Sequence, residues 1–452
     1  MTAQRILGFG VVGWAGMRPE QWLSDCRVPH APLFSPEVAP EEGGEPASTA
    51  RESVWPGLVP DNEGTVTPTP PPLGDVRAFA ASLFTRIEPQ LLWGFRAEPL
   101  LGAKGLRTFD RLTRLTLVAV QGALQESGLG DLAARCPDRF GLAWGSAFGA
   151  LESIEELHRV AELEEPRFIN PNRFPNTVAN AAAGQVAIWY GVTGPNITAV
   201  DGRCSGASAL AHAARKLDAG EADCMLVGVS ETLSLGMCQA LDAQAARAEA
   251  LRLPGFPSRY GEGSVFMALG RAEDPALSAA AADSAAPTLG FHLATALRFQ
   301  SPGDGRRLVY PERALARAIT TALTEAGLSP QDVDVVLLGG AIVEGAALDA
   351  ERRAVAEVLG GGARMCVPGS VWGECFAVNA GFNWLAALSL FAGGAWPTPA
   401  PAGDGAGRPD GFAASAAAQR SAERGRPDIV LVVSTDTQGL AAATILRSPS
   451  AT

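Results

Sequence analysis

Histidine is scarce in this sequence, with only four among 452 residues. They are His30, His158, His212 and His292. Cations are also in the minority, since 36 Lys and Arg face 48 Asp and Glu and leave a formal net charge of -12. This balance argues against a nucleic-acid partner, because phosphate backbones favour clustered Lys and Arg.

Metal-ligand and membrane patterns are absent as well. Seven cysteines show no CxxC or Cys/His ligand spacing, which fits reduced thiols better than a disulfide framework or a zinc site. The glycine-rich stretches lack the context of a phosphate-binding loop, so we expect no nucleotide, flavin, metal or other cofactor. No apolar run could span a bilayer, and residues 6–12 are too short and too glycine-interrupted for a signal peptide. We therefore expect a cytoplasmic protein without a membrane span.

The composition describes a folded protein with a large core. Hydrophobic residues make up 47% of the chain and charged residues 19%, which excludes wholesale disorder. Two stretches rich in Pro, Gly and small residues, at about 35–75 and 396–427, are predicted to be loop insertions. A shorter Ala/Ser/Pro stretch at 274–287 is predicted to link two halves, residues 1–275 and 288–452.

The two halves repeat the same order of elements. Each contains an amphipathic helix that ends at glycine, at 111–130 and 314–327, followed by an apolar strand. The predicted strands are 6–12, 140–145, 197–200, 224–229, 333–339, 365–368, 429–434 and 443–447. Further helices are predicted at 205–219 and 380–391, and the latter is apolar on most sides, as in a buried helix. Strands alternating with helices indicate α/β architecture with mainly parallel sheets covered on both faces.

One cysteine stands where a predicted strand ends and a helix begins. Residues 199–208 read AVDGRCSGAS, in which the cysteine is Cys204. Unpaired backbone N–H groups at a helix start favour a thiolate, and Arg203 adds a neighbouring cation. The small residues around Cys204 would let a thioester approach closely. The alternative is a buried cysteine that acts only as a small apolar side chain.

Motifs on both sides of this turn resemble those of the β-ketoacyl synthase (ketosynthase) family of the thiolase superfamily. NPNRFPNTVANAAAG at 170–184 resembles the family's NPxxFPxTxxNAxAG stretch, and GPNIT at 194–198 resembles the strand before its active cysteine. YGEG at 260–263 resembles its GEGA strand, and RTFDR at 107–111 resembles the stretch that opens an early helix. The motifs occur in the family's order over nearly the whole chain.

The resemblance implies a thiolase-like fold, with duplicated βαβ halves stacked as five αβαβα layers and working as a dimer. In active members the cysteine takes an acyl group, as a thioester, from the phosphopantetheine of an acyl carrier protein. Two histidines, in an HGTGT loop and a KxxxGH segment, then assist decarboxylation of a malonyl unit. Cys204 is the implied acyl-accepting nucleophile if this chain is active. The acidic net charge does not exclude a carrier protein, which could dock on a local basic patch.

The catalytic loops of the family are altered here. None of the four histidines lies in them: Ala341 stands at the first histidine position, and Glu374 or Cys375 stands at the second. The family's late GFGG loop, which supplies an oxyanion-hole amide, is also replaced. It reads Asp436, Thr437, Gln438 and Gly439. Glu344 and Asn379 are candidate substitutes in these loops. A positioned acid–base group contributes about 10²–10⁴-fold and an oxyanion donor about 10²–10³-fold, so we do not expect unaided condensation.

Three functions remain open. The first is a non-catalytic subunit of type II polyketide or fatty-acid biosynthesis, similar to a chain-length factor, that forms a heterodimer with a catalytic ketosynthase and shapes the acyl pocket. Chain-length factors usually have Gln where this chain has Cys204, so the similarity is to the role. The second is a Cys204-dependent acyltransferase that moves acyl groups from a carrier protein without condensation. The third is an active synthase with non-standard catalytic residues, working as a homodimer.

Overall fold

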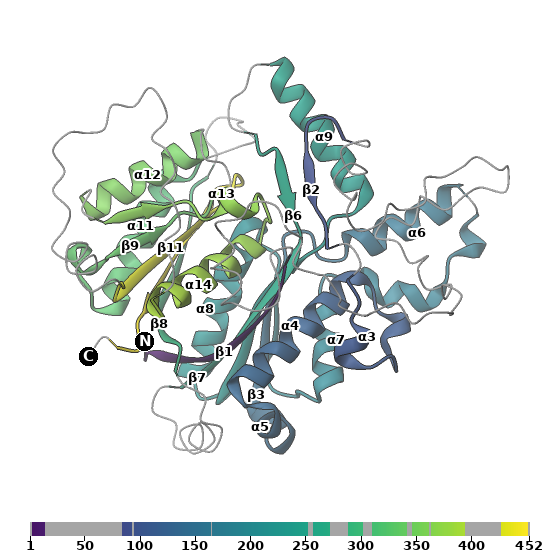
Figure 1. The fold of residues 1–452 in the computed structure, drawn as a ribbon, viewed down its shortest axis with the longest axis horizontal. Coiled ribbons are helices and arrows are strands. Elements are labelled where there is room, and N and C mark those ends of the chain that lie inside the picture. Colours follow the sequence, from purple (N-terminus) through teal and green to yellow (C-terminus); the bar gives the residue numbers. More distant parts are fainter. Residues whose placement is uncertain are drawn as a thin grey trace, which may run out of the picture.

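The computed structural model describes residues 2–13, 84–92, 95–163, 165–251, 256–271, 288–301, 310–340, 346–360, 363–393 and 426–450. The predicted insertion at 35–75 and the predicted linker at 274–287 lie outside these residues. So do all but the last two residues of the insertion at 396–427, and so do Ala341 and Glu344. The described chain is a mixed α/β structure in which helices cover both faces of a large sheet (Figure 1).

Ten of the described strands form one sheet, in the order β10-β9-β11-β12-β8-β1-β7-β5-β3-β4. Their bounds are β1 (Gln4–Gly13), β3 (Phe140–Gly145), β4 (Asn196–Ala199), β5 (Cys224–Glu231), β7 (Gly263–Arg271), β8 (Gly290–Phe299), β9 (Val335–Leu337), β10 (Arg364–Cys366), β11 (Ile429–Thr435) and β12 (Leu440–Arg447). A separate parallel pair joins β2 (Glu88–Gln90) to β6 (Arg259–Gly261). Within the large sheet, the earlier strands take the order β4-β3-β5-β7-β1 and the later ones the corresponding order β10-β9-β11-β12-β8. The predicted repetition of elements is therefore a repeated strand order.

Each strand group combines a parallel part with an antiparallel part. Strands β4, β3 and β5 run parallel, as do β10, β9 and β11. In contrast, β7 pairs antiparallel with both β5 and β1, and β12 does so with both β11 and β8. The carboxyl ends of the parallel strands lead into the loops that carry the predicted site residues.

The helices form three layers around the two strand groups (Figure 1). Their bounds are α3 (Glu98–Leu101), α4 (Arg111–Ser127), α5 (Gly130–Arg135), α6 (Leu151–Leu163), α7 (Ala181–Tyr190), α8 (Ser205–Asp218), α9 (Leu235–Ala250), α11 (Glu312–Ala326), α12 (Ala346–Leu359), α13 (Gly369–Trp372) and α14 (Val378–Phe391). Helix α4, with α7 against it, covers the first strand group, while α11 and α12 cover the second. Helices α8 and α14 contact strands of both groups, which gives the αβαβα layering that the resemblance implies. Among the described helices, none has the length and hydropathy needed to cross a membrane.

Local sequence signals set the ends of the outer helices. Helix α4 begins where the Asp110 side chain accepts a hydrogen bond of 2.8 Å from the backbone N–H of Thr113. It ends at Gly128, whose φ of +66° is left-handed, so it is shorter than the predicted 111–130. Helix α11 ends in the same way at Gly327, with a φ of +68°. Both predicted helices are confirmed apart from these end shifts.

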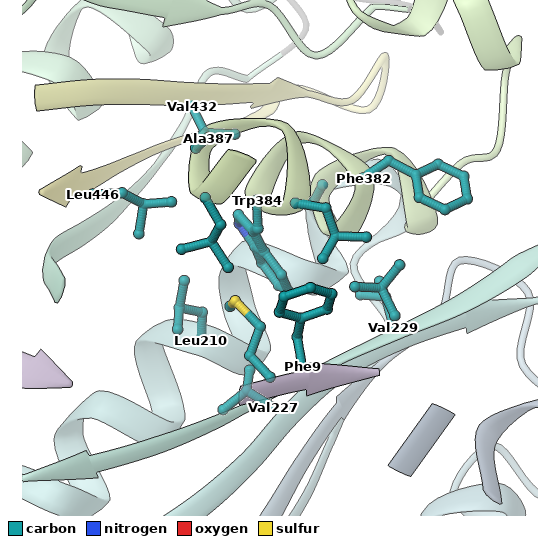
Figure 2. Close-up of a cluster of buried hydrophobic side chains, with 14 of the residues drawn as sticks. Phe9, Leu210, Val227, Val229, Phe382, Trp384, Ala387, Val432 and Leu446 are labelled. Carbon is teal, nitrogen blue, oxygen red and sulfur yellow. The ribbon is translucent and has the colours of Figure 1, made fainter. Parts of the chain in front are cut away.

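Helix α14 forms the buried centre of the molecule (Figure 2). All of its residues are buried, and Trp384 packs among side chains from both strand groups. Gly206 in α8 permits the close approach of the two central helices, because a Cβ there would stand 2.9 Å from the Cβ of Ala380. Since α8 begins directly after Cys204, this packing fixes the position of the cysteine turn.

The two strand groups meet where β1 pairs with β8 over three residue pairs. At this seam His292 is fully buried, with Nδ1 2.6 Å from Oε1 of Gln4 and Nε2 2.9 Å from Oγ1 of Thr295. Oγ1 of Thr295 lies 3.0 Å from Oγ1 of Thr444. Burial lowers the pKa of His292 to about 4, so the ring is neutral at pH 7 and acts as part of the seam.

Candidate functional site

The cysteine turn connects β4 to α8. After β4 ends at Ala199, a 3-10 turn, η9, spans Gly202–Cys204, and α8 begins at Ser205. Gly202 has a φ of +59°, and a Cβ there would stand 2.2 Å from Oδ2 of Asp436, so the turn requires glycine. The predicted place of Cys204, between a strand end and a helix start, is confirmed.

The Cys204 thiol is enclosed by backbone from the second strand group. The residue is fully buried, and its Sγ lies 3.6 Å from the carbonyl oxygens of both Ser434 and Leu440. Carbonyl oxygens accept hydrogen bonds, so these contacts hold the sulfur as a protonated donor. The contacts stabilise the thiol form and do nothing for a thiolate.

The charges around Cys204 also disfavour the thiolate. Burial raises the pKa of the Cys204 thiol well above its ordinary value, nearby carboxylates raise it further, and one cation opposes them. The carboxylates are Asp436, Glu351 and Asp201, and the cation is Arg203. Arg203 lowers the pKa, as its charge implies, but desolvation and the carboxylates outweigh it. The surroundings of Cys204 therefore favour the protonated thiol overall.

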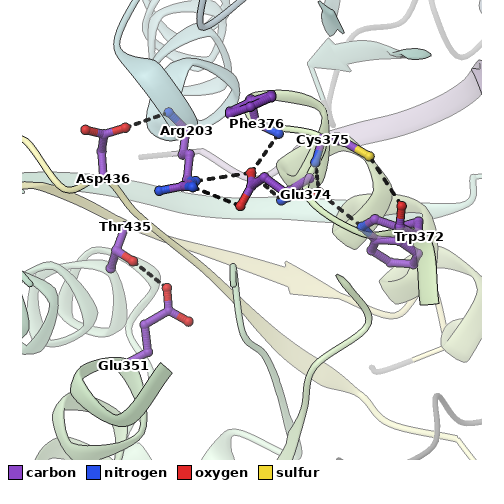
Figure 3. A network of polar contacts seen from close by, with 9 residues as sticks. Arg203, Glu351, Trp372, Glu374, Cys375, Phe376, Thr435 and Asp436 are labelled. Carbon is purple, nitrogen blue, oxygen red and sulfur yellow. Dashed lines mark hydrogen bonds and ion pairs between the residues drawn. The ribbon is translucent and has the colours of Figure 1, made fainter. Parts of the chain in front are cut away.

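Arg203 directs its guanidinium group toward a carboxylate in the altered second loop (Figure 3). Its Nη2 lies 2.9 Å from Oε2 of Glu374 and its Nε lies 3.1 Å from Oε1, so the pair is bidentate. The Glu374 side chain is 2% exposed and that of Arg203 is 27% exposed. The cation beside Cys204 is thus neutralised by a buried partner.

The rest of the second loop is tied to Glu374 and Asn379. Oε1 of Glu374 accepts hydrogen bonds from the backbone N–H of Phe376, at 2.8 Å, and from Nδ2 of Asn379, at 3.1 Å. Oδ1 of Asn379 accepts from Nε1 of Trp372 and from the backbone N–H of Cys375, both at 3.1 Å. Asn379 and Glu374 therefore hold the loop's own backbone, which gives both a positioning role within it.

Cys375 lies inside this loop rather than opposite a substrate. It is fully buried, its Sγ lies 3.7 Å from the carbonyl oxygen of Trp372, and burial raises its pKa well above the ordinary value. The next residue, Phe376, has a φ of +52°, which is unusual for a residue with a side chain. Its ring makes an edge-to-face contact with Phe148 and stacks near Tyr260. The Cys375 thiol carries no positive charge, and its hydrogen is directed at the carbonyl oxygen of Trp372, so it does not reproduce the histidine of the family motif.

The loop between β11 and β12 uses its amides internally. The backbone N–H of Gln438 donates to Oδ1 of Asp436 at 2.8 Å, and that of Gly439 donates to the carbonyl of Asp436 at 3.0 Å. Oδ2 of Asp436 accepts from the backbone N–H of Arg203 at 3.0 Å. The amides of Gln438 and Gly439 therefore both donate hydrogen bonds to Asp436. Thr437 lies between Asp436 and Gln438 in this loop. These two amides therefore do not point outward as oxyanion-hole donors do.

Glu351 is a further carboxyl group near the cysteine turn that sequence reasoning misses. It is buried on α12 and accepts hydrogen bonds from Oγ1 of Thr435 and from the backbone N–H of Gly339, the latter at 3.1 Å. Burial raises its pKa to about 7, against the opposite effect of these hydrogen bonds. The available signal was helical spacing, because Glu351 lies three residues after Leu348 and four before Val355 on the apolar face of α12.

Of the predicted site residues, the structure brings Cys204, Glu374 and Asp436 together around Arg203. Cys375 and Asn379 join the same region through the second loop. Among the described residues, the structure holds no group of three or more His, Cys, Asp or Glu side chains that could bind a metal.

Sequence comparison relates part of the chain to known proteins. Residues 78–251 match the family described as "Beta-ketoacyl synthase, N-terminal domain". The chain is 32% identical over 194 residues to 3-oxoacyl-(acyl-carrier-protein) synthase 2 of Vibrio cholerae, and 27% identical over 249 residues to the Staphylococcus aureus enzyme of the same name. Over residues 78–251 the chain is thus similar to the N-terminal domain of β-ketoacyl synthases. The matches to the two relatives cover 42% and 54% of this chain, and 45% and 60% of the relatives, which is less than two thirds of either.

Solved structures of ketosynthases match the fold of this chain over nearly its whole length. A β-ketoacyl synthase from Burkholderia phymatum aligns with a TM-score of 0.71 and 18% identity, covering 99% of this chain and all of that one. The ishigamide ketosynthase/chain length factor aligns with a TM-score of 0.63 and 24% identity, covering 99% of both chains. At this identity the likeness establishes the thiolase-like fold and leaves the activity to the site residues.

Proposed function

We propose that this chain is a ketosynthase-family subunit that does not condense acyl units itself and that completes the acyl pocket of a catalytic ketosynthase, in the manner of a chain-length factor. The observation that carries the proposal is the buried, bidentate ion pair between Arg203 and Glu374 beside Cys204. Through this pair the cation that precedes Cys204 in the chain is bound to a buried carboxylate. Its experimental test is the assembly of the chain with a ketosynthase partner.

Condensation chemistry argues against catalysis by this site. The cysteine must become a thiolate to accept an acyl group, and the enolate formed from a malonyl unit must be stabilised by cations or hydrogen-bond donors. Around Cys204 the nearby charges are mostly carboxylates, and the amides of Gln438 and Gly439 already donate to Asp436. Nearby carboxylates destabilise both the thiolate and the enolate. We therefore expect the site to lose several kcal/mol of transition-state stabilisation, which corresponds to the rate effect of about 10²–10⁴-fold of one acid–base group.

The edge of the sheet supports a protein partner. Among the described strands, β4 stands at the end of the large sheet, with β3 as its neighbour. Exposed edge strands present backbone groups that pair readily with another chain. Large apolar side chains are exposed on η8 (Pro171–Thr177), directly after it, on α7, which contacts both η8 and β4, and directly after β4. They are Phe174, Val178, Ile188 and Val200, which are 64%, 50%, 76% and 46% exposed.

The structural neighbours support this class of partner. They include a ketosynthase in complex with its chain length factor from Xenorhabdus doucetiae, and a type II polyketide synthase acyl-carrier protein in complex with its ketosynthase. We therefore propose a heterodimer with a catalytic ketosynthase, which receives acyl chains from the phosphopantetheine of an acyl carrier protein. The cytoplasm is the proposed location.

Co-expression with candidate catalytic ketosynthases, followed by native mass spectrometry, tests the proposal. We expect a stable one-to-one heterodimer with the right partner, and its loss with Val200→Asp, which places a charge at the β4 edge. Leu251→Asp, at the end of α9 and 59% exposed, is the matched control and should leave assembly unchanged. A homodimer of this chain alone that forms carbon–carbon bonds from malonyl and acyl thioesters would contradict the proposal.

A further inference from the structure

The hairpin formed by β11 and β12 covers the Cys204 thiol. Its sulfur lies 3.6 Å from the carbonyl oxygens of Ser434 and Leu440, which belong to the two strands of this hairpin. The cysteine itself is fully buried. The apolar residues that cluster with it are Ala207, Ala442, Leu297 and Leu440. Movement of the hairpin end away from the cysteine turn would therefore uncover the sulfur.

Asp436 ties the end of this hairpin to the cysteine turn (Figure 3). Its Oδ2 accepts a hydrogen bond of 3.0 Å from the backbone N–H of Arg203, and its Oδ1 accepts one of 2.8 Å from that of Gln438. Gly202 leaves room for the carboxylate, because a Cβ there would stand 2.2 Å from Oδ2. One carboxylate thus bridges the backbone of the turn and the backbone of the loop, through bonds that a charged acceptor strengthens.

A second anchor holds the other side of the loop. Gln300, directly after β8, donates its backbone N–H to the carbonyl oxygen of Gly439 at 2.8 Å. Gly439 has a φ of +104°, and a Cβ there would stand 2.2 Å from the carbonyl oxygen of Gln300, so this contact requires glycine. The second anchor is formed by backbone groups, whereas the first depends on a charged side chain.

We propose that residues 436–439 form a strap that closes Cys204 off from thioesters, and that Asp436 and Gly439 are the two positions that fasten it. The inference rests on the proposed function in one respect, since it explains how a subunit that accepts no acyl group can retain the cysteine. The strap acts through access. While both anchors hold, the sulfur stays buried, and loss of either anchor increases the fraction of molecules in which the loop is locally open.

Alkylation by iodoacetamide at pH 7.5 measures how often the sulfur of Cys204 is uncovered. In this reaction the thiolate sulfur forms a bond to the methylene carbon, iodide leaves, and the thiol proton passes to water. Peptide mapping by mass spectrometry gives the rate for each cysteine. We expect Cys204 to react at least about tenfold faster in Asp436→Ala than in the unmodified chain, because the hydrogen bonds to a charged acceptor are lost. Buried Cys224 reports global unfolding and should stay slow.

Gly439→Ala separates access from charge. It pushes the loop away from Gln300 without changing any charge, so the Cys204 rate should again rise, by at least about fivefold. Gly327→Ala is the control for backbone strain, because its φ is also left-handed but its Cβ would meet open space, and it should leave the rate unchanged. Asp201→Ala is the control for charge. Asp201 is an exposed carboxyl of the same turn whose side chain makes no capping hydrogen bond, so its loss should change the rate less than about twofold.

Three outcomes would overturn the proposal. They are an unchanged Cys204 rate in Asp436→Ala or Gly439→Ala, an equal acceleration in Asp201→Ala, and a parallel acceleration of Cys224, which would mean that the loop does not open locally. Where Asp436→Ala does not fold, Asp436→Asn takes its place, since it keeps the volume and one acceptor oxygen. Its Cys204 rate should rise at least about threefold, and an unchanged rate would equally reject the strap. The assay uses the chain alone, so a closed cysteine in a chain that binds no ketosynthase would reject the proposed function and leave this inference standing.

Discussion

Arg203 and Glu374 lie 171 positions apart in the chain and meet in a bidentate ion pair directly beside Cys204. Arg203 belongs to the turn before α8, and Glu374 belongs to the loop before α14. The two central helices of the fold are thus joined at their N-terminal ends by charge as well as by apolar packing. This link is a structural element of the fold, and it is the feature on which the proposed non-condensing role depends.

Removal of one partner of this pair should destabilise the protein. Glu374→Ala leaves the partly buried Arg203 cation unpaired and frees the N–H of Phe376, so we expect a loss of about 3 kcal/mol in the free energy of unfolding. Urea denaturation measures this difference. Glu312→Ala, which breaks the largely exposed pair with Arg353, is the control and should cost less than about 1 kcal/mol. Equal effects of the two substitutions would show that the buried pair has no special structural role.

The cysteine turn should not tolerate a side chain at Gly202. Gly202→Ala combines a left-handed φ of +59° with a Cβ 2.2 Å from Oδ2 of Asp436, so the loop after β11 must move. We expect a loss of about 3 kcal/mol in unfolding free energy, measured by urea denaturation. Gly327→Ala provides the comparison, because its φ of +68° is similar but its Cβ would meet open space. Gly327→Ala should lower the unfolding free energy by only about 1 kcal/mol. An equal loss at both positions would argue that backbone strain alone explains the requirement for glycine at position 202.

The seam between the strand groups should weaken in mild acid. The pKa of His292 is about 4 in the folded protein against an ordinary value of 6.5, so below pH 6.5 the unfolded state binds more protons at this residue. Stability from His292 is therefore complete above pH 6.5 and is lost as the pH falls toward 4. Between pH 7 and pH 5 we expect the unmodified chain to lose about 2 kcal/mol relative to His292→Gln.

Comparing the unmodified chain with His292→Gln separates the effect of His292 on stability from the effects of other titratable groups. The buried carboxyls with raised pKa values contribute stability that is lost as the pH rises, which is the opposite slope. They are Glu152, Glu231 and Glu351. Because both chains share them, the difference in unfolding free energy reports His292 alone. His212→Gln, on the exposed side of α8, is the control, and an equal change in slope for both substitutions would contradict the account of the seam.

The spacing of apolar residues along the chain is sufficient to predict most of the fold. The apolar sequence of α14 and the glycines that end α4 and α11 are local signals, and each of these helices lies close to its predicted position. The Cys204 turn was also predicted, because strand, turn and helix follow one another in the chain. What the sequence could not indicate was which charged residues meet across the two halves.

The ion pair illustrates this limit. Arg203 reads as an activating cation when only its neighbours in sequence are considered, and Glu374 reads as a replacement at the second histidine position. Only the three-dimensional arrangement places them together and reverses both interpretations, since each neutralises the other. The internal use of the amides at Gln438 and Gly439 is equally non-local, because it depends on where the Asp436 side chain turns.

The position of the acyl group in an assembled complex tests the central claim most directly. A heterodimer with a catalytic ketosynthase is incubated with an acyl-loaded carrier protein, and the intact mass of each chain is measured. The account predicts an acyl adduct on the ketosynthase chain and none on this one, because the Cys204 thiol stays protonated beside the Arg203–Glu374 pair. A stoichiometric acyl adduct at Cys204 of this chain would contradict it and would favour the acyltransferase function.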